Sequence, residues 1–321
     1  MPMLFCGDMK TCFLFPGQGA QYAGMSKDLW ESSPRVKELF QSASDAARMD
    51  MKKLLFDSSD EDLMATDKTQ VAMTLACLCS STVLRERGIV PAACAGFSLG
   101  EYAALCEAGV LKVADVFPIV RIRGELMEKA ARGMDSKDGA PGMAAVLGLP
   151  AQKTVAAVEA LSSSGVYPAN YNSPVQVVVS GTAQGLAVAE KELKAAGAKR
   201  LVRLQVSGPF HSPLMAEARA AFDEALTAFS FADPATAVYS NVTGKKLGSG
   251  AEARELCGRQ LVSMVRWVEV QEALFADGCG RFFEAGPGTV LTGLLRALRP
   301  EAPCFPAGTL VAIGKALEAK V

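Results

Sequence analysis

Apolar and polar positions follow two patterns along the first part of the chain. Short apolar runs, typical of buried strands, alternate with longer segments whose apolar side chains recur every three or four residues, as they do in helices. The expected strands are Thr11–Phe15 and Ala92–Gly96, and the expected helices are Leu29–Ala47, Thr69–Arg87, Glu101–Ala108 and Val116–Ala131. This alternation predicts a parallel sheet with helices on both faces.

The pattern changes after Gly133, where the polar and glycine-containing segment Met134–Pro141 predicts a linker. The elements expected next run in the order strand, helix, strand, strand, helix, strand: Met143–Leu149, Ala151–Leu161, Val166–Asn170, Gln176–Ser180, Ala183–Ala196 and Arg200–Val206. This is the order of a ferredoxin-like unit. We therefore predict a small ferredoxin-like domain at 137–206 and a large α/β domain formed by 1–136 and 207–321.

Alternation resumes in the last third of the chain. Strands are expected at Ala237–Ser240 and Arg281–Glu284, and helices at Ala251–Ser263, Glu269–Ala276 and Leu291–Leu298. These elements predict that the C-terminal part completes the parallel sheet of the large domain.

Composition narrows the function. The chain has 321 residues, of which 50% are hydrophobic, and its formal net charge is −1. A charge so close to zero provides no field that would attract nucleic acid or an acidic membrane, so neither is expected as a partner. Asp8 and Lys10 interrupt the apolar N-terminal segment, and no apolar run reaches about 18 residues, so we predict neither a signal peptide nor a membrane span. We expect a cytoplasmic protein.

Cysteine and histidine content argues against a metal site. The chain has nine cysteines, an odd number, with no C-x-x-C pair, and only one histidine. Zinc sites of the usual spacing need more ligands of these types in register. We expect buried, reduced thiols that act as small apolar residues.

One serine stands in the pentapeptide Gly96-Phe97-Ser98-Leu99-Gly100, between an expected strand and an expected helix. G-x-S-x-G in this context is a nucleophile elbow, in which glycines permit a sharp turn that exposes the hydroxyl. A serine hydroxyl needs a neighbouring base. His211 is the only imidazole in the chain, so the sequence predicts that Ser98 and His211 meet. No acidic residue stands out as a third member that would orient the histidine.

Two other segments carry candidate chemistry. The loop Pro16–Gly19 follows the first strand, and loops at the carboxyl ends of parallel strands gather over one site, so the Gln18 N–H is a candidate oxyanion donor beside the Leu99 N–H. Arg121 and Arg123 lie next to Gly124 in an expected helix. An arginine there is a candidate clamp for a carboxylate.

Taken together, these residues resemble the malonyl-CoA:acyl-carrier-protein transacylases and the related acyltransferase domains of polyketide synthases. The resemblance covers nearly the whole chain. Its markers appear in family order: Phe15–Gly19, Thr69-Gln70, Gly96–Leu105, Arg123-Gly124-x-x-Met127, Asn170–Ser173, Gly208–Ser212, Ser240–Thr243 and Glu284–Gly288.

The resemblance implies an α/β-hydrolase-like large domain with an inserted ferredoxin-like domain. It also implies that Ser98 takes the acyl group and that His211 is the base, oriented by a backbone carbonyl. The N–H groups of Gln18 and Leu99 would form the oxyanion hole, and Arg123 would bind the malonyl carboxylate. Residues expected to line the pocket or set selectivity are Phe97, Phe210, Gln70 and Asn172.

Two positions depart from the family pattern, and one favours a particular substrate. Phe97 replaces the usual histidine before the nucleophile, and Arg266 stands where some members have glutamine. If the interaction at Arg266 uses the main chain, that change matters little. Phe210 resembles malonyl-selecting members, because it would crowd the α-methyl branch of methylmalonyl. Lys199 and Arg200 are the expected docking residues for an acidic carrier protein.

The sequence thus predicts a monomeric enzyme that transfers malonyl from malonyl-CoA to acyl carrier protein through an acyl-serine, without metal or redox cofactor. A serine esterase or thioesterase, in which water removes the acyl group, is the alternative, as is a trans-acting polyketide synthase acyltransferase. A non-catalytic subunit that binds carrier protein is disfavoured by the presence of all three residues Ser98, His211 and Arg123.

Overall fold

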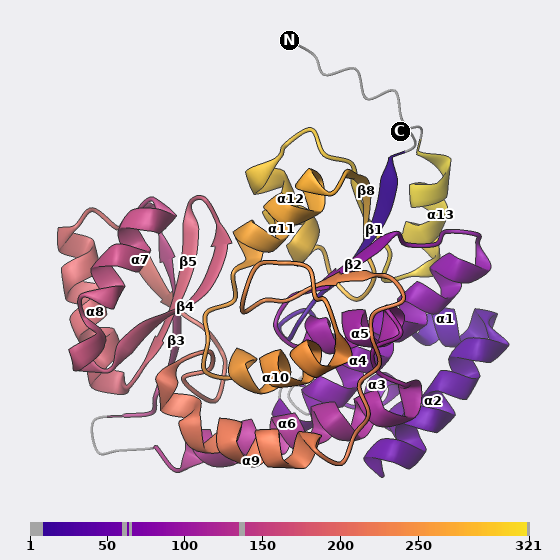
Figure 1. The fold of residues 1–321 in the computed structure, drawn as a ribbon, viewed down its shortest axis with the longest axis horizontal. Helices are drawn as coiled ribbons and strands as arrows, with labels where there is room; N and C mark the ends of the chain where they lie inside the picture. The colour runs from indigo at the N-terminus through magenta and orange to yellow at the C-terminus, as the bar shows by residue number, and fades with distance from the viewer. Residues whose placement is uncertain (1–8, 60–62, 64–65, 135–138, 320–321) are drawn as a thin grey trace.

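A parallel sheet lies at the centre of the larger part of the molecule (Figure 1). The computed structural model describes residues 9–59, 63, 66–134 and 139–319. The sheet has the strand order β7-β2-β1-β8-β9, and all its pairings are parallel. Its strands are β1 (Lys10–Phe15), β2 (Ala93–Gly96), β7 (Ala237–Tyr239), β8 (Cys279–Glu284) and β9 (Cys304–Pro306).

Helices cover both faces of this sheet, as the sequence predicts. Phe13 and Phe15 of β1 face one hydrophobic core, and the alternate residues Cys12 and Leu14 face another. The helices of this part are α1 (Lys27–Ser32), α2 (Pro34–Ala47), α3 (Met51–Phe56), α4 (Thr66–Glu86), α5 (Gly100–Glu107), α6 (Val113–Arg132), α9 (Ala216–Leu226), α10 (Gly250–Gln260), α11 (Trp267–Ala276), α12 (Val290–Leu298) and α13 (Leu310–Glu318).

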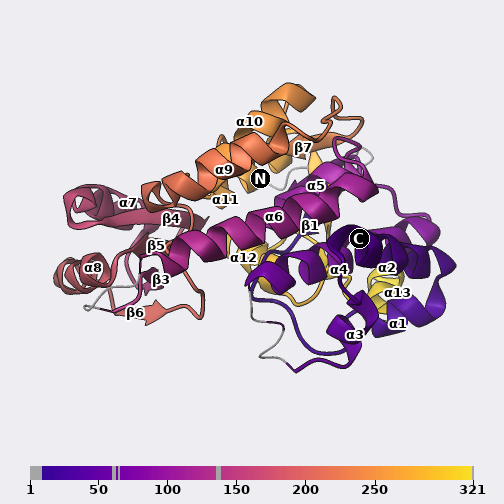
Figure 2. The ribbon, with the colours of Figure 1, turned by 90° about the horizontal axis from the view of Figure 1, so that it is seen from below.

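A second, antiparallel sheet forms the smaller part, with the order β4-β5-β3-β6. Helices α7 and α8 pack on it around a core of their own. The elements are β3 (Gly142–Leu147), α7 (Ala151–Glu159), β4 (Val166–Ser173), β5 (Gln176–Gly181), α8 (Ala183–Ala195) and β6 (Arg200–Arg203). The predicted β-α-β-β-α-β order is confirmed. Figure 2 shows α6 running from the large part towards this sheet.

A loop residue of the large part pairs by its backbone with the small sheet. The N–H of Val265 donates to Ala169 O at 2.8 Å, and the N–H of Tyr171 donates to Val265 O at 2.9 Å. The segment that precedes α11 therefore bonds to β4 of the small sheet. The domain bounds at 137–206 stay a prediction, because residue 137 and much of the predicted linker lie outside the described residues.

Several element predictions need correction. Leu29–Ala47 is not one helix: Ser33 is extended, with φ −128° and ψ 123°, and its hydroxyl accepts a hydrogen bond from Val36 N at the start of α2. Proline at position 34 disfavours helical backbone in the residue before it, and this ends α1. The last small-domain strand stops at Arg203 rather than Val206. Helices α3, α9 and α13 and strand β9 were not predicted from the sequence.

The structure also bears on the cysteines. Eight of them lie in the described ranges as free thiols, and all except Cys106 are buried, as expected for small apolar residues. None of the helices in those ranges combines the length and the apolar character needed to cross a membrane.

Candidate active site

The serine pentapeptide forms a tight turn between β2 and α5. Ser98 has φ +51°, a left-handed conformation that is uncommon for a residue with a side chain. A Cβ at Gly96 would lie 2.0 Å from the carbonyl oxygen of Gly100, and a Cβ at Gly100 would lie 2.0 Å from Phe15 O. Both glycines are therefore required by close backbone approach, as a nucleophile elbow predicts.

Asn241, in the loop after β7, makes two hydrogen bonds to the backbone of the elbow. Its Oδ1 accepts a hydrogen bond from the Ser98 N–H at 2.6 Å, and its Nδ2 donates to Gly96 O at 2.7 Å. The side chain is fully buried. These two bonds satisfy backbone groups that the strained turn would leave unpaired. The first of them occupies the N–H of Ser98, so that group is not free to bind an oxyanion.

Ser98 and His211 meet, as the sequence predicts. Ser98 Oγ lies 2.7 Å from His211 Nε2, and His211 Nδ1 lies 2.8 Å from the backbone oxygen of Gln260. Because a carbonyl can only accept, Nδ1 carries the proton and Nε2 is left to accept from the serine hydroxyl. A backbone carbonyl thus takes the orienting position for which no acidic residue could be identified.

Burial keeps this imidazole neutral. His211 is 4% exposed, and desolvation, aided by the positive charge of Arg123, lowers its pKa from 6.5 to about 4. At neutral pH the ring is therefore able to take a proton from Ser98. His211 also has φ +58°. Both members of the pair thus sit in strained backbone conformations, as is common at active sites.

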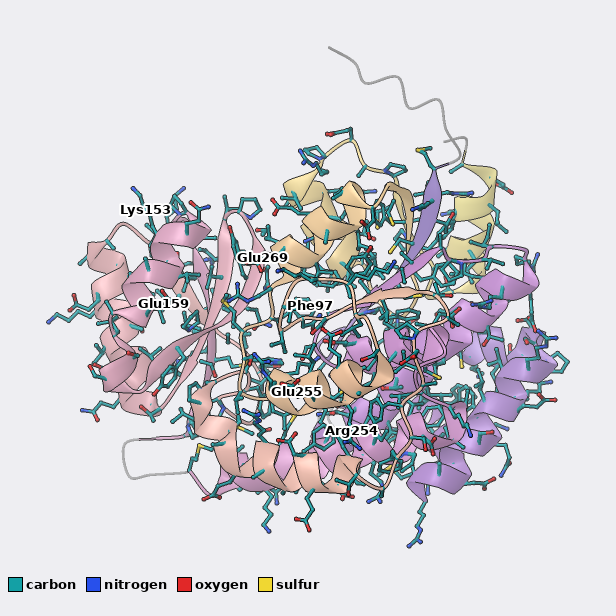
Figure 3. The ribbon with its side chains drawn as sticks, in the orientation of Figure 1. Phe97, Lys153, Glu159, Arg254, Glu255 and Glu269 are labelled. Carbon is teal, nitrogen blue, oxygen red and sulfur yellow. The ribbon has the colours of Figure 1, made fainter. Side chains whose placement is uncertain are left out.

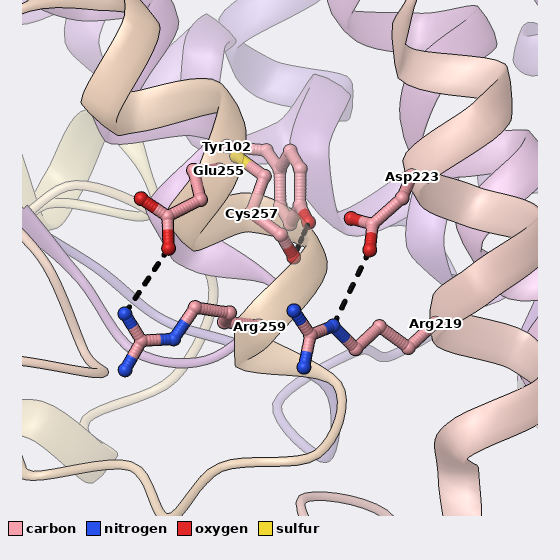
Figure 4. A network of polar contacts seen from close by, with 6 residues as sticks. All are labelled: Tyr102, Arg219, Asp223, Glu255, Cys257 and Arg259. Atoms are coloured by element: carbon pink, nitrogen blue, oxygen red, sulfur yellow. Dashed lines mark hydrogen bonds and ion pairs between the residues drawn. The ribbon is translucent and has the colours of Figure 1, made fainter.

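Gln260, the last residue of α10, connects the parts of the site. Besides its backbone oxygen on His211, its Nε2 donates to Ser98 O at 3.1 Å and its Oε1 accepts from Arg123 Nη2 at 3.0 Å. Helix α10 is itself fixed to α5, since the Tyr102 hydroxyl donates to the carbonyl oxygen of Cys257 at 3.4 Å (Figure 4).

Arg123 projects from α6 into the same network. It is 1% exposed, and its Nη1 donates to Gln70 Oε1 at 2.9 Å. Its guanidinium lies 5.4 Å from the centre of the Tyr102 ring. Within the described residues, its Nε has no hydrogen-bond partner. Arg121, in contrast, pairs with Glu125 at 2.5 Å near the surface, so only Arg123 is placed to bind a ligand beside Ser98.

Glu101, in the first turn of α5, is a buried carboxyl that was not singled out from the sequence. Its Oε2 accepts from Gln260 Nε2 at 2.6 Å and from the Asn241 N–H at 3.1 Å. Burial raises the pKa of Glu101 from 4.5 to about 7, although hydrogen bonds from Gln260 and Asn241 and the charge of Arg123 oppose the rise.

This pKa predicts how stability depends on pH. The folded state holds the Glu101 proton more tightly than the unfolded state. The stability that protonated Glu101 contributes to the folded state is therefore complete below pH 4.5 and is lost as pH rises through about 7. The free energy of unfolding of the wild type should fall, relative to Glu101→Gln, by on the order of 3 kcal/mol over this range. Urea unfolding of both proteins at several pH values measures the difference. Parallel pH dependences would contradict it.

Three residues of this network, Glu101, Asn241 and Gln260, were thus not predicted from sequence. Most of their partners lie more than 100 positions away, as in the bonds of Gln260 and Asn241 to Glu101, although Gln260 is only 49 positions from His211. The one available signal was a charged residue at Glu101, in the first turn of the helix after the elbow, where the next five residues are uncharged.

Two backbone donors remain free beside the elbow. Gln18 follows Gly17, where a Cβ would lie only 2.5 Å from Phe97 O, so the loop after β1 touches the elbow. Leu99 precedes the first residue of α5. Within the described part of the chain, the N–H groups of Gln18 and Leu99 donate to no other group. Both are therefore available to an oxyanion that forms at Ser98.

Residues 12–310 match the acyl transferase domain family. The chain belongs to this family. It is 40% identical over 289 residues to a protein of Bacillus subtilis named malonyl CoA-acyl carrier protein transacylase, covering 89% of this chain and 90% of that one.

Solved acyltransferase structures are similar over their full length. A structure from Streptococcus pneumoniae titled MCAT has a TM-score of 0.91 and 35% identity, covering 96% of this chain and 99% of that one. A second, titled as a malonyl-transacylase in complex with a type II polyketide synthase acyl-carrier protein, has a TM-score of 0.90 and 35% identity, with 96% and 99% covered. The large α/β domain with a small ferredoxin-like domain is the fold of this acyltransferase family.

The two departures from the family pattern have local explanations. The Phe97 ring packs edge-on against Trp267, with ring centres 5.4 Å apart, near the middle of the molecule (Figure 3). The Arg266 side chain pairs with Glu269 at 2.9 Å, whereas its backbone N–H donates to Asn241 O at 2.9 Å. The bond of Arg266 to Asn241 therefore uses the main chain, and any residue other than proline can make it.

The predicted pocket residues Phe210 and Asn172 are buried, whereas the predicted docking residues Lys199 and Arg200 are exposed. Phe210 is buried beside Gly208, and Asn172 in β4 donates from Nδ2 to Gln176 at 2.9 Å while its Oδ1 has no partner among the described residues. Lys199 and Arg200 are exposed at the start of the edge strand β6. No hydrogen bond or ion pair of these two side chains reaches the serine site in the described structure.

Proposed function

We propose that this chain transfers the malonyl group of malonyl-CoA to the phosphopantetheine thiol of acyl carrier protein. The observation that carries the proposal is the 2.7 Å contact of Ser98 Oγ with a neutral His211, beside the buried guanidinium of Arg123. Such a site combines an activated nucleophile with a carboxylate-binding group.

In the first half-reaction, His211 Nε2 takes the Ser98 proton as Oγ attacks the thioester carbonyl. The oxyanion of the tetrahedral intermediate accepts hydrogen bonds from the N–H groups of Gln18 and Leu99. Each donor of this kind accelerates the reaction by a factor of about 10²–10³. When the intermediate collapses, the C–S bond breaks, and His211 returns the proton to the CoA thiolate. Ser98 is left as the malonyl ester.

In the second half-reaction, the carrier-protein thiol gives its proton to His211 and attacks the ester, and the same steps run in reverse. Each step exchanges one acyl bond for another of similar energy, so the transfer is reversible and requires no metal or redox group. The kinetics are ping-pong, because CoA leaves before the carrier protein is acylated.

Arg123 supplies the selectivity for a carboxylated acyl group. Gln70 and Gln260 each accept a hydrogen bond from one N–H of its guanidinium, and these bonds fix the plane of the group. The remaining donors, including the unpaired Nε–H, are available to the two oxygens of a carboxylate. Phe210 and Asn172 line the pocket, and Phe210 disfavours a branched acyl group.

Incubation with malonyl-CoA, followed by intact-protein and peptide mass spectrometry, tests the proposal. We expect the mass of one malonyl group on the peptide that contains Ser98, and its loss when carrier protein bearing phosphopantetheine is added. Label on another residue, or none, would overturn the proposal. The Ser98→Ala variant is the control for non-enzymatic acylation.

A serine hydrolase is the second candidate, because the nucleophile elbow is common to both classes. Water would then remove the acyl group, and malonyl-Ser98 would be short-lived in buffer. A buried carboxylate-binding arginine favours the transferase, since a hydrolase needs none. The lifetime of the acyl-serine without carrier protein separates the two.

Lys199 and Arg200 are proposed to bind the acidic carrier protein. Reversal of both charges by Lys199→Glu and Arg200→Glu should raise the KM for carrier protein about tenfold at low salt and remove most of its salt dependence. The KM for malonyl-CoA should not change. Arg35→Glu with Lys37→Glu is the matched control, because these exposed residues lie on α2, on the other side of the molecule in Figures 1 and 2. Equal effects of the two pairs would exclude a docking role.

A further inference from the structure

Two ionisable side chains are buried in the hydrogen-bond network that includes Ser98. Glu101 is 2% exposed and Arg123 is 1% exposed. The Gln260 amide connects them, because its Nε2 donates to Glu101 and its Oε1 accepts from Arg123. Arg123 thus has one buried counter-charge, although the two groups are not in direct contact by any bond of the described structure.

The other titratable groups around Glu101 are uncharged near neutral pH. Burial raises the pKa of Tyr102 on α5 and of Cys257 on α10, so both keep their protons. The pKa of His211, which bonds to Gln260 O, is lowered to about 4, so it is neutral. Among the described residues, Arg123, from α6, is the one other charged group that acts on Glu101. Among these groups, Glu101 alone changes its charge between about pH 6 and 8.

A malonyl group on Ser98 adds a second carboxylate to this network. If it binds Arg123, one buried cation faces two anions. Leaving a net negative charge in a desolvated site is costly, and two carboxylates that share a site avoid the cost when one of them takes up a proton. The malonyl carboxylate bonds directly to the guanidinium, whereas Glu101 reaches it only through an amide. Glu101 is therefore the group that is neutralised.

We propose that Glu101 takes up a proton when malonyl is loaded onto Ser98, so that its carboxyl adjusts the charge of the pocket to an anionic acyl group. This inference rests on the proposed function. Acyl transfer itself moves the Ser98 proton to the thiol of CoA, which keeps it near neutral pH, so transfer neither releases nor consumes a proton. The extra proton comes from solvent and converts the Glu101 carboxylate to the acid.

The direct test measures protons and acylation together. Wild-type enzyme is mixed with malonyl-CoA in weakly buffered solution at about pH 7.5 with an indicator dye, and Ser98 acylation is quantified by mass spectrometry. We expect uptake of about half a proton or more for each Ser98 acylated, given a carboxyl that is largely ionised before loading. Acetyl-CoA, which carries no carboxylate, should give acetyl-Ser98 without uptake.

The Glu101→Gln variant identifies the group. The amide preserves the shape and provides an oxygen for the bonds from Gln260 and Asn241. We expect this variant to load malonyl without proton uptake. The KM for malonyl-CoA should rise roughly five- to tenfold between pH 6.5 and 8 in the wild type and stay flat in Glu101→Gln. The KM for acetyl-CoA should be flat in both.

The outcomes separate this inference from the proposed function. Malonyl loading of Ser98 with no proton uptake in the wild type, or with the same uptake in Glu101→Gln, overturns the role of Glu101 and leaves the transferase intact. Absence of malonyl on Ser98 in the wild type overturns the proposed function instead. The wild-type measurement needs no variant, so it stands even if Glu101→Gln folds poorly.

Discussion

Replacement of Arg123 by alanine is expected to slow malonyl loading of Ser98 by about 30- to 4,000-fold. This range corresponds to the roughly 2–5 kcal/mol lost when one partner of a buried, hydrogen-bonded charge pair is removed. Acetyl loading should be retained or should increase, because acetyl makes no use of the guanidinium. Parallel assays with malonyl-CoA and acetyl-CoA, with acyl-Ser98 quantified by mass spectrometry, give the ratio directly.

The same helix provides the control for this experiment. Arg121 lies two residues away on α6, and its ion pair with Glu125 is near the surface, so Arg121→Ala should change either rate by less than about threefold. Equal losses of malonyl and acetyl loading in Arg123→Ala would show that the residue supports the fold and does not select the substrate.

Replacement of His211 by alanine should lower the rate of loading by about 10²–10⁴-fold with every acyl-CoA, since it removes the general base. The loss should be common to malonyl and acetyl, unlike the effect at Arg123. No second imidazole exists in the chain to substitute for it. Single-turnover acylation of Ser98 is the appropriate measurement.

Free imidazole offers a second readout for the histidine. The substitution removes a buried ring that contacts Ser98 Oγ, and added imidazole that enters this space should restore part of the rate. A variant that loads acyl groups as fast as the wild type would mean that another group activates Ser98.

Local signals in the sequence were sufficient for most of the fold. The ferredoxin-like order was predictable because turn residues separate most elements of the small part, such as Gly148, Pro150, Gly165, Pro174 and Gly197. The α9 helix was missed because its buried face consists of only Ala218, Phe222 and Leu226, in an alanine-rich segment with a weak apolar stripe. The three-residue strand β9 is defined by its pairing with β8 and has no pattern of its own.

Part of the site could also be predicted from the sequence, and part could not. The contact of Ser98 with His211 was predictable because the chain has one nucleophile elbow and one histidine. The roles of Glu101, Asn241 and Gln260 could not follow, because a glutamate in a helix or an amide in a loop is ordinary until the fold brings its partners near. Asn241, for example, bonds to residues about 140 positions away. Such contacts depend on the tertiary arrangement of β2, α5 and α10.

The solitary imidazole described above also makes the protein convenient for spectroscopy. Selective ¹⁵N labelling of histidine would yield just two ring-nitrogen resonances, both from His211. Their chemical shifts distinguish the neutral tautomers from the cation, so the spectrum would follow the reactive base itself, without assignment of overlapping signals, as acyl groups and carrier protein are added.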